Sequence, residues 1–349
     1  MTQAPAPAML LDSTALESWL RGHIPGFTGP LSLEKFPGGQ SNPTYRLITP
    51  AKNYVMRRKP PGQLLPGAHA VDREYRVISA LSKQGFPVPR TYAYCTDIGI
   101  IGTEFFVMEL VEGRIFWDPA FRDIPVSERA AYFAAMNATL AQLHKIDYAA
   151  AGLEGYGKPG NYFARQIARW SRAYREDELA GRIPAMDRLA GWLPENIPDD
   201  GEETSIVHGD FRCDNMIFHP AEPRVIAVLD WELSTLGHPL ADFAYHVMMY
   251  RTPQGLPAGM EGLDPVELGL PTEAEYVAQY CANTGRQDIP GMDFYIAFNL
   301  FRFAAIIHGI KGRLLRGNAS SAHADKMVSR LDDLAAAAWA QAQRAGAKP

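Results

Sequence analysis

The chain has 349 residues, of which 47% are hydrophobic and 21% charged, enough to build a substantial core. Its net charge of −5 and its pI near 6.0 exclude an overall basic field, so nucleic acid and anionic membrane surfaces are not expected partners. Its three cysteines lack metal-binding spacing, and neither a signal-peptide pattern nor a membrane-spanning apolar run is visible. These features predict a globular, cytoplasmic protein.

The first part of the chain is expected to form a small sheet. After a tail and leading helix at 1–26, the runs LSLEKF, TYRLI and NYVMRRK read as three consecutive antiparallel strands separated by turns. Apolar residues then recur at helical spacing in HAVDREYRVISALSKQG, and Gly85 with the prolines after it ends that helix. Two more strands, RTYAYCTD and TEFFVMELVEG, complete a small lobe, a sheet carrying one helix, predicted at 27–111.

The remainder, 112–349, is expected to be a larger and mainly helical lobe. Long helical segments are predicted around 272–284, 291–316 and 321–344. Two short apolar runs, SIVHGD and VIAVLDWE, interrupt the helices and read as strands. The fold class predicted is therefore α+β, with two lobes that meet in sequence near Glu109–Gly113.

Two aspartates stand at the ends of these apolar runs, Asp210 after SIVHG and Asp230 after VIAVL, with Asn215 in the loop between them. If the two runs pair as strands, the three side chains return to the same place. A buried carboxylate there is costly unless it meets a cation, a proton donor or several backbone N–H groups. One carboxylate and one amide oxygen leave room for water and phosphate oxygens around Mg²⁺, which favours Asn215 and Asp230 as metal ligands. Asp210 is then free to accept a proton from an attacking hydroxyl as a general base.

Each of these residues by itself is typical of a polar turn. The spacing D-x-x-x-x-N, followed by an aspartate fifteen positions later at a strand end, favours a functional site. A metallohydrolase built on His208, Asp210 and Asp214 is an alternative, although the other histidines show no HExxH-type pairing.

The stretch HGDFRCDN resembles the H-R-D-x-x-x-x-N catalytic loop of the protein-kinase-like fold, and DWE stands at the place of D-F-G. The His-Gly-Asp form is similar to the aminoglycoside and choline phosphotransferase family. The resemblance implies a small β-sheet lobe with one helix and a larger helical lobe, with ATP and Mg²⁺ as cofactors. It also implies that Asp242, in GHPLADFAYHV, braces the catalytic loop through backbone N–H groups and that His208 orients it.

The resemblance also assigns the basic residue that faces the phosphates. YVMRRK aligns with the V-A-I-K pattern so that Arg57 stands where the family has lysine, and Arg58 or Lys59 could carry the role instead. Glu74, in the helix that follows, is the matching carboxylate for an ion pair.

Two backbone segments complete the implied nucleotide site. The turn in FPGGQSNPTY would approach the phosphates, and the segment MELVEG would present its backbone to adenine. The residues implied here are Gly38, Gly39, Ser41, Asn42, Glu109 and Val111.

Longer stretches, such as VLDWELSTLGHPLADFAYH, resemble the phosphotransferase domain fused to acyl-CoA dehydrogenases in some proteins. That resemblance implies transfer of the γ-phosphoryl group of ATP to a small-molecule hydroxyl, with a hydroxyacyl-CoA as one candidate acceptor and an acyl-CoA dehydrogenase as a candidate functional partner. No flavin-binding pattern is visible, and the chain is expected to have no room for the dehydrogenase itself. A nucleotide-binding pseudokinase and an aminoglycoside-type antibiotic kinase are the alternatives.

Overall fold

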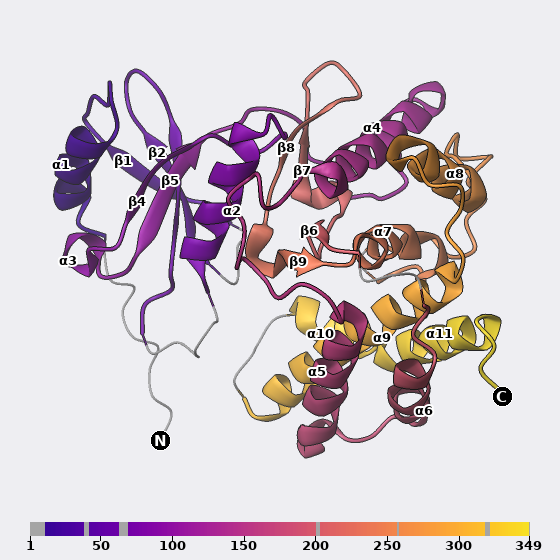
Figure 1. Cartoon of the computed structure of the whole chain (residues 1–349). Helices are drawn as coiled ribbons and strands as arrows, with labels where there is room; N and C mark the ends of the chain where they lie inside the picture. Colours follow the sequence, from indigo (N-terminus) through magenta and orange to yellow (C-terminus); the bar gives the residue numbers. More distant parts are fainter. Residues whose placement is uncertain are drawn as a thin grey trace. The chain divides into compact units, whose positions relative to one another are not determined.

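A computed structural model describes residues 11–37, 42–62, 69–199, 203–256, 258–317 and 322–348, with backbone only at 322 and 323. The chain divides into two compact units, coloured along the sequence in Figure 1. Unit 1 comprises Met1–Glu112 with Ala227–Glu232, and unit 2 comprises Gly113–Ile226 with Leu233–Pro349. The domain boundaries predicted at 26/27 and 111/112 stay predictions, and they do not include the return of 227–232 to unit 1.

Unit 1 is built on a five-stranded antiparallel sheet in the order β1-β2-β3-β5-β4. All five strands predicted from the sequence are present. Arg57 in β3 lies opposite Thr44 of β2 and Phe106 of β5, so it occupies a central strand. The strands are β1 Ser32–Lys35, β2 Thr44–Ile48, β3 Tyr54–Arg58, β4 Thr91–Cys95 and β5 Phe105–Glu109.

The leading helix α1 (Ser13–His23) belongs to the core of unit 1. Asp12 caps it by accepting hydrogen bonds from the backbone N–H groups of Thr14 and Ala15, at 3.0 and 2.9 Å. Leu16 and Leu20 are fully buried in one cluster with residues of β2, β3 and β5. The helix α2 (Val71–Lys83) contacts β4 and β5, and a short helix α3 (Ile98–Ile101) precedes β5.

Unit 2 is mainly helical, and α9 (Met292–Leu315) lies at its centre, in contact with α5, α7 and α11. The helix predicted over 321–344 is divided, because a turn at Ser329 and Arg330 separates α10 from α11. The other helices are α4 Val126–Lys145, α5 Tyr162–Glu176, α6 Pro184–Trp192, α7 Pro239–Val247, α8 Glu273–Thr284, α10 Ala322–Val328 and α11 Leu331–Arg344. Single-turn 3₁₀ helices occupy Glu178–Ala180, Leu193–Glu195, Cys213–Asn215, Trp231–Leu233 and Met248–Arg251.

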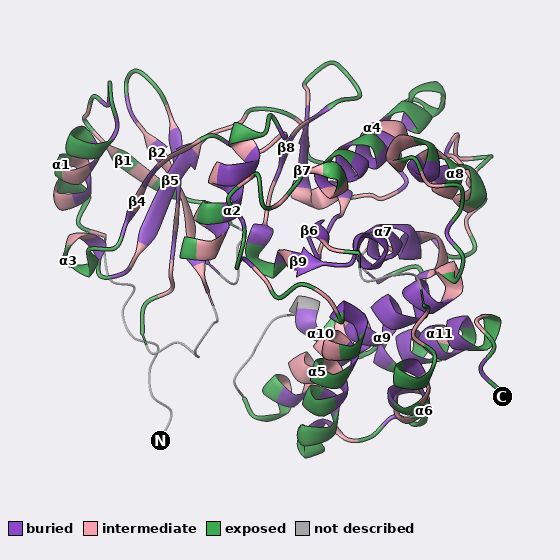
Figure 2. Ribbon diagram, viewed as in Figure 1, coloured by how far each residue is buried: buried purple, intermediate pink, exposed green. Residues whose placement is uncertain are grey.

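The helix α9 is the one described segment whose length and composition would allow it to cross a membrane, a property that the sequence inspection did not detect. In the structure, 72% of its most apolar window is buried inside the protein, and Figure 2 shows the helix mostly in the colour of buried residues. A helix that is apolar on all sides is also what the centre of a large helical unit requires.

Two short sheets frame the candidate catalytic loop. The strand β6 (Ser205–Val207) pairs antiparallel with β9 (Thr235–Gly237), and β7 (Met216–Phe218) pairs with β8 (Val225–Val228). The pairing considered for SIVHGD and VIAVLDWE is therefore wrong, because each of these runs has another strand as its neighbour. The additional strands, MIF and TLG, are only three residues long, which is too short for a periodic signal in the sequence.

Candidate active site

The loop between β6 and β7 carries Asp210 and Asn215, and it holds the Asp210 carboxylate from several directions. The Tyr245 hydroxyl donates to Oδ1, and Arg212 Nε lies 3.2 Å from the same oxygen. Asn215 Nδ2 donates to Oδ2 at 3.0 Å and to the Asp210 carbonyl at 2.9 Å. All of these partners are donors, so the carboxylate is held in one orientation as an acceptor, as a general base requires.

The Tyr245 hydroxyl, which comes from α7, stays a proton donor to Asp210. Burial raises the pKa of Tyr245, and the negative charge of Asp210 raises it further. Sequence reasoning missed this residue. Its signal was its position three residues after Asp242 on a helix, which places both side chains on neighbouring parts of one face.

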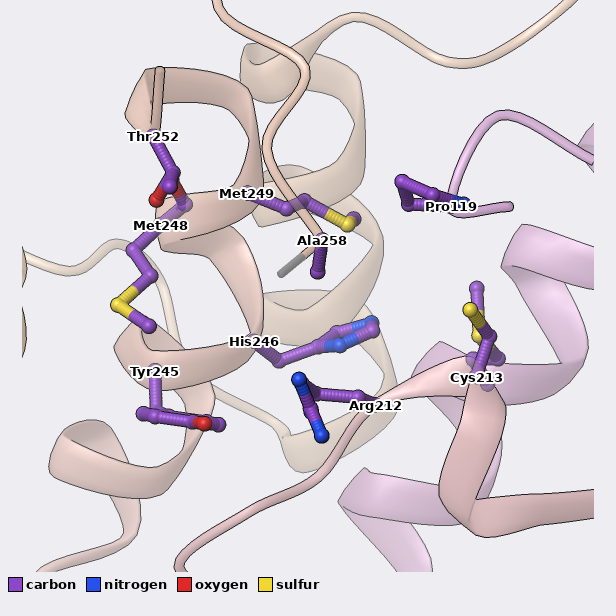
Figure 3. Close-up of a pocket in the computed structure, with 10 residues that line it drawn as sticks. Pro119, Arg212, Cys213, Tyr245, His246, Met248, Met249, Thr252 and Ala258 are labelled. Carbon is purple, nitrogen blue, oxygen red and sulfur yellow. The ribbon is translucent and has the colours of Figure 1, made fainter. Parts of the chain in front are cut away.

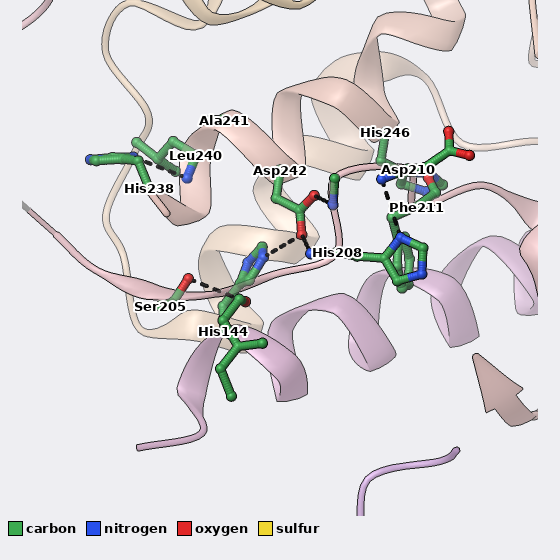
Figure 4. Close-up of polar contacts among 12 residues, drawn as sticks. His144, Ser205, His208, Asp210, Phe211, His238, Leu240, Ala241, Asp242 and His246 are labelled. Carbon is green, nitrogen blue, oxygen red and sulfur yellow. Dashed lines mark hydrogen bonds and ion pairs between the residues drawn. The ribbon is translucent and has the colours of Figure 1, made fainter. Parts of the chain in front are cut away.

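Asp242 anchors the base of the loop from inside unit 2, as Figure 4 shows. Its two oxygens accept hydrogen bonds from the backbone N–H groups of His208, at 2.7 Å, and Gly209, at 2.8 Å. His144 Nε2 lies 3.2 Å from Oδ2, and its Nδ1 lies 2.6 Å from the Tyr280 hydroxyl. The bracing role predicted for Asp242 is confirmed by these contacts.

Burial by itself would raise the pKa of Asp242. The hydrogen bond and charge of His144, the nearby His208 and the backbone N–H of His208 outweigh that effect, so the pKa of Asp242 is lowered. His208 is fully buried, and its Nδ1 accepts a hydrogen bond from the backbone N–H of Asp210 at 3.2 Å. His208 therefore orients the loop, as predicted.

Gly209 suits this loop because a side chain there would be strained and closely crowded. Its φ is +83°, and a Cβ added there would stand 3.0 Å from the Leu233 carbonyl oxygen. Arg302 of α9 is 7% exposed and donates from Nη2 to the Gly209 carbonyl at 2.9 Å. Arg302 is thus a buried support of the loop.

In unit 1, Arg57 connects two carboxylates. Its Nε lies 2.9 Å from Glu74 Oε2, and its Nη2 lies 2.8 Å from Asp230 Oδ1. Glu232 lies farther away, at 3.7 Å. The ion pair expected between Arg57 and Glu74 is present, and it is buried, because Glu74 is only 1% exposed. Burial raises the pKa of Glu74, and the Arg57 guanidinium opposes that shift.

The other two basic residues of β3 make different contacts. Lys59 Nζ lies 2.9 Å from Glu104 Oε2. Arg58 is 3% exposed and donates from Nε to the Lys59 carbonyl at 3.3 Å. Among the three candidates for the family lysine, Arg57 is the one paired with Glu74.

Asp230 follows β8 in a conformation that favours only a few residue types. Its φ is +63°, which aspartate tolerates better than most residues that have a Cβ. Trp231 fixes this turn, because its Nε1 donates to the Val228 carbonyl at 3.0 Å and its ring packs edge-on against Phe86. The side chain of Asp230 is 36% exposed.

The predicted nucleotide-binding turn is described in part. Gly38, Gly39 and Ser41 lie outside the described residues. Asn42 is fully buried and its Nδ2 donates to Glu74 Oε1 at 2.7 Å. The buried Glu74 carboxylate thus takes an N–H of Asn42, and the part predicted for Asn42 in phosphate binding stays a prediction.

The adenine-binding prediction concerned Glu109 and Val111. The backbone N–H of Glu109 donates to the Arg90 carbonyl at 2.8 Å, so in this structure it is engaged within unit 1. Val111 follows β5 and is half-buried.

The oxygens of Asn215 and Asp230 are suited to a hard cation. Asn215 uses its Nδ2 within the loop, so Oδ1 is the atom that it could offer to a cation. Asp230 uses Oδ1 toward Arg57, so Oδ2 is the atom that it could offer. Within the described ranges, no group of three or more His, Cys, Asp and Glu side chains could hold a metal. An amide oxygen in unit 2 and a carboxylate oxygen in unit 1 are each of the type that Mg²⁺ binds, and the role of Asn215 and Asp230 as joint ligands stays a prediction.

His246, at the end of α7, illustrates how the buried site responds to pH. Its Nδ1 lies 3.0 Å from the Phe211 carbonyl and its Nε2 lies 2.7 Å from the Tyr276 hydroxyl. Burial lowers the pKa of His246 to about 4, against the opposing effects of the Phe211 hydrogen bond and the Asp242 charge.

We expect this histidine to make the folded protein sensitive to mild acid. The unfolded chain, with the ordinary histidine pKa of 6.5, binds more protons than the folded state between about pH 6.5 and pH 4. The free energy of unfolding should fall as the pH decreases through this window, by up to about 3 kcal/mol. Denaturant titrations at several pH values measure this, and His246→Gln should reduce the slope. An unchanged slope in that variant would contradict the assignment.

Comparison with known proteins supports one family. The model of the phosphotransferase enzyme family matches residues 32–295. A Ralstonia eutropha protein with the provisional name aminoglycoside phosphotransferase has a crystal structure with a TM-score of 0.88 and 49% identity, covering 96% of this chain and 99% of that one. An aminoglycoside phosphotransferase crystallised with AMP-PNP and hygromycin B has a TM-score of 0.63 and 16% identity, covering 96% of this chain and 100% of that one. The kinase-like α+β fold predicted from the sequence is confirmed.

A mammalian relative has a different name. Acyl-CoA dehydrogenase family member 10 of Mus musculus is 44% identical over 341 residues, which are 97% of this chain and 32% of that protein. The chain thus spans about a third of the length of this relative. The structural relatives named as phosphotransferases support small-molecule phosphotransferase activity for this chain. Its fold and the match over residues 32–295 show that the chain belongs to the phosphotransferase enzyme family.

Proposed function

We propose that the protein transfers the γ-phosphoryl group of ATP, with Mg²⁺, to a hydroxyl group of a small-molecule metabolite. The observation that carries this proposal is the Asp210 carboxylate, oriented by Tyr245 and Asn215 in a loop that Asp242 holds by two backbone N–H groups. Such a base accepts the proton of the attacking hydroxyl. Positioning of this kind, with charge neutralisation, supplies most of the rate enhancement in phosphoryl transfer.

In this proposal, unit 1 contributes the nucleotide-binding groups. Arg57, held by Glu74, contributes a permanent positive charge toward the phosphates. Mg²⁺, held by Asn215 and Asp230, would neutralise phosphate charge when bound. The complex of a distant structural relative with AMP-PNP supports an adenine nucleotide as the phosphoryl donor.

For the acceptor, we propose a metabolic hydroxyl compound, with a hydroxyacyl-CoA as the leading candidate. The likeness to a protein named as an acyl-CoA dehydrogenase family member supports this choice and a functional partnership with such a dehydrogenase. An antibiotic acceptor is the second candidate, favoured by the name of the Ralstonia relative.

The three cysteines are buried and unpaired, in keeping with the proposed cytoplasmic location.

The decisive experiment measures ADP release with Mg-ATP and a panel of hydroxyacyl-CoAs, amino alcohols, sugars and aminoglycosides. We expect acceptor-dependent release with hydroxyacyl-CoAs and a phosphorylated product by mass spectrometry. ADP release with aminoglycosides only would mean that the acceptor is an antibiotic and not a metabolite. Nucleotide binding without transfer to any member of the panel would favour a pseudokinase.

We expect Arg57, rather than its basic neighbours, to contribute to ATP affinity. Because charge-assisted hydrogen bonds contribute about 1.5–3 kcal/mol, Arg57→Ala should weaken ATP binding about ten- to a hundredfold. Arg57→Lys keeps a positive charge beside Glu74, so its ATP affinity should lie between those of the wild-type protein and Arg57→Ala. Calorimetric titration with ATP measures the effect, and Lys59→Ala, which removes a contact to Glu104 instead, is the matched control. Equal losses in both alanine variants would rule out the assignment.

A further inference from the structure

A small cavity in unit 2 is lined by two residues, Arg212 and Tyr245, that also contact the candidate base Asp210. We propose that this cavity binds an aliphatic segment of the acceptor, a few carbons from the hydroxyl that is phosphorylated. We call it the methionine pocket. Its apolar lining is Pro119, Met136, Cys213, Met248, Met249 and Ala258, several of which Figure 3 labels. The proposal rests on the proposed function for the role of Asp210.

The position of the pocket follows from Arg212 and Tyr245. Both side chains line the pocket, and both also contact Asp210 Oδ1, Arg212 through Nε at 3.2 Å and Tyr245 through its hydroxyl. One layer of side chains therefore separates the cavity from the candidate base. A molecule with a hydroxyl near Asp210 could extend an attached chain past these walls into the pocket.

The charges around the pocket favour an uncharged chain. The residues that line it include no aspartate or glutamate, so it offers no partner to a polycation. The charge of Arg212 is already opposed by Asp210 and Asp214, at 3.2 and 3.1 Å. The ring nitrogens of His246, also in the lining, are engaged with Phe211 and Tyr276. The hydroxyl of Thr252, also in the lining, donates to the Met248 carbonyl at 2.8 Å. The remaining surface is methionine, cysteine, proline and alanine, which matches the chemistry of an alkyl chain.

The lining is also adaptable. The cavity is about 20 Å³, which is room for about one water molecule, so a chain enters only when side chains move. Methionine is unbranched and flexible, and it adapts to apolar ligands of different shape. Met136, Met248 and Met249 come from two segments, α4 and the turn after α7, and all three are at most 5% exposed. We infer that they turn aside to admit the chain.

The test uses the full chain and a homologous series of hydroxyacyl thioesters of N-acetylcysteamine, from short to medium length. Calorimetric titration without ATP measures binding, and ADP release with Mg-ATP measures transfer. In the wild-type protein, each methylene that enters the pocket should tighten binding about fourfold, which corresponds to about 0.8 kcal/mol.

Substitutions of Met249 should change this dependence on length. Met249→Phe fills the cavity and should weaken binding of the longest thioester about tenfold or more. Met249→Ala enlarges the cavity and should extend the gain in affinity per methylene to longer chains. Met186→Ala, a buried methionine of α6 outside the pocket, is the matched control, and thermal melting verifies that each variant folds. Affinities that do not depend on chain length, or that change equally in the control, would overturn the proposal.

The two proposals fail in different ways. Length-dependent binding that Met249 variants alter, without ADP release from any acceptor, would retain the pocket and reject the phosphotransfer. Transfer to a hydroxyl acceptor with no effect of chain length or of Met249 would retain the phosphotransfer and reject the pocket.

Discussion

Asp210→Asn is expected to lower kcat about 10²–10⁴-fold, the usual contribution of a positioned base. The asparagine keeps the size of the side chain but cannot accept the proton. Its one acceptor oxygen can keep the hydrogen bond from Tyr245 or the one from Asn215, which now donate to different carboxylate oxygens, but not both. The contacts by which Asp242 holds the backbone of the loop are not touched by the substitution. We therefore expect the loop to remain folded and the loss to appear in kcat, while ATP affinity measured by titration changes little.

The matched control for this variant is Asp214→Asn. Asp214 lies in the same loop and pairs with Arg212 at 3.1 Å, but no chemical role is assigned to it. Its substitution should cost far less activity than that of Asp210. If Asp210→Asn turned over acceptor at the wild-type rate, or if both variants lost activity equally, the general-base assignment would be wrong.

Asp242→Asn is expected to lower the free energy of unfolding by about 3–5 kcal/mol, as for other broken buried ionic contacts. Asp242 is 2% exposed and accepts from two backbone N–H groups and from His144. An asparagine has one acceptor oxygen, so its NH₂ group would face a backbone N–H, and at least one buried donor would lose its partner. Urea denaturation followed by circular dichroism measures the change.

The same variant should also reduce kcat, because the N–H groups that lose their partner belong to the two residues preceding Asp210. Asp177→Asn provides the comparison, since Asp177 pairs with Arg316 nearer the surface at 2.7 Å, and such pairs contribute about 0–1 kcal/mol. A loss of stability in Asp242→Asn no larger than in this control would mean that Asp242 does not brace the loop.

The sequence alone was sufficient to predict all five strands of the first sheet and the helix at 71–83. It also indicated the candidate catalytic loop, where the chemical roles of the residues stay predictions. These features depend on local periodicity, on turn residues and on the spacing of a few polar side chains. They are encoded over short stretches, so they can be recognised before any contact is known.

The contacts between distant segments were decided only by the tertiary structure. The strand β6 pairs with β9, the Glu74 side chain is buried beside Arg57, and Tyr245 of the helix α7 contacts Asp210 in the loop after β6. Sequence patterns show which face of an element is apolar, but not which other element covers it. Charge is costly where water is excluded. The buried Glu74 carboxylate therefore depends on the Arg57 guanidinium for its negative charge, and the buried Tyr245 hydroxyl stays protonated and remains a hydrogen-bond donor.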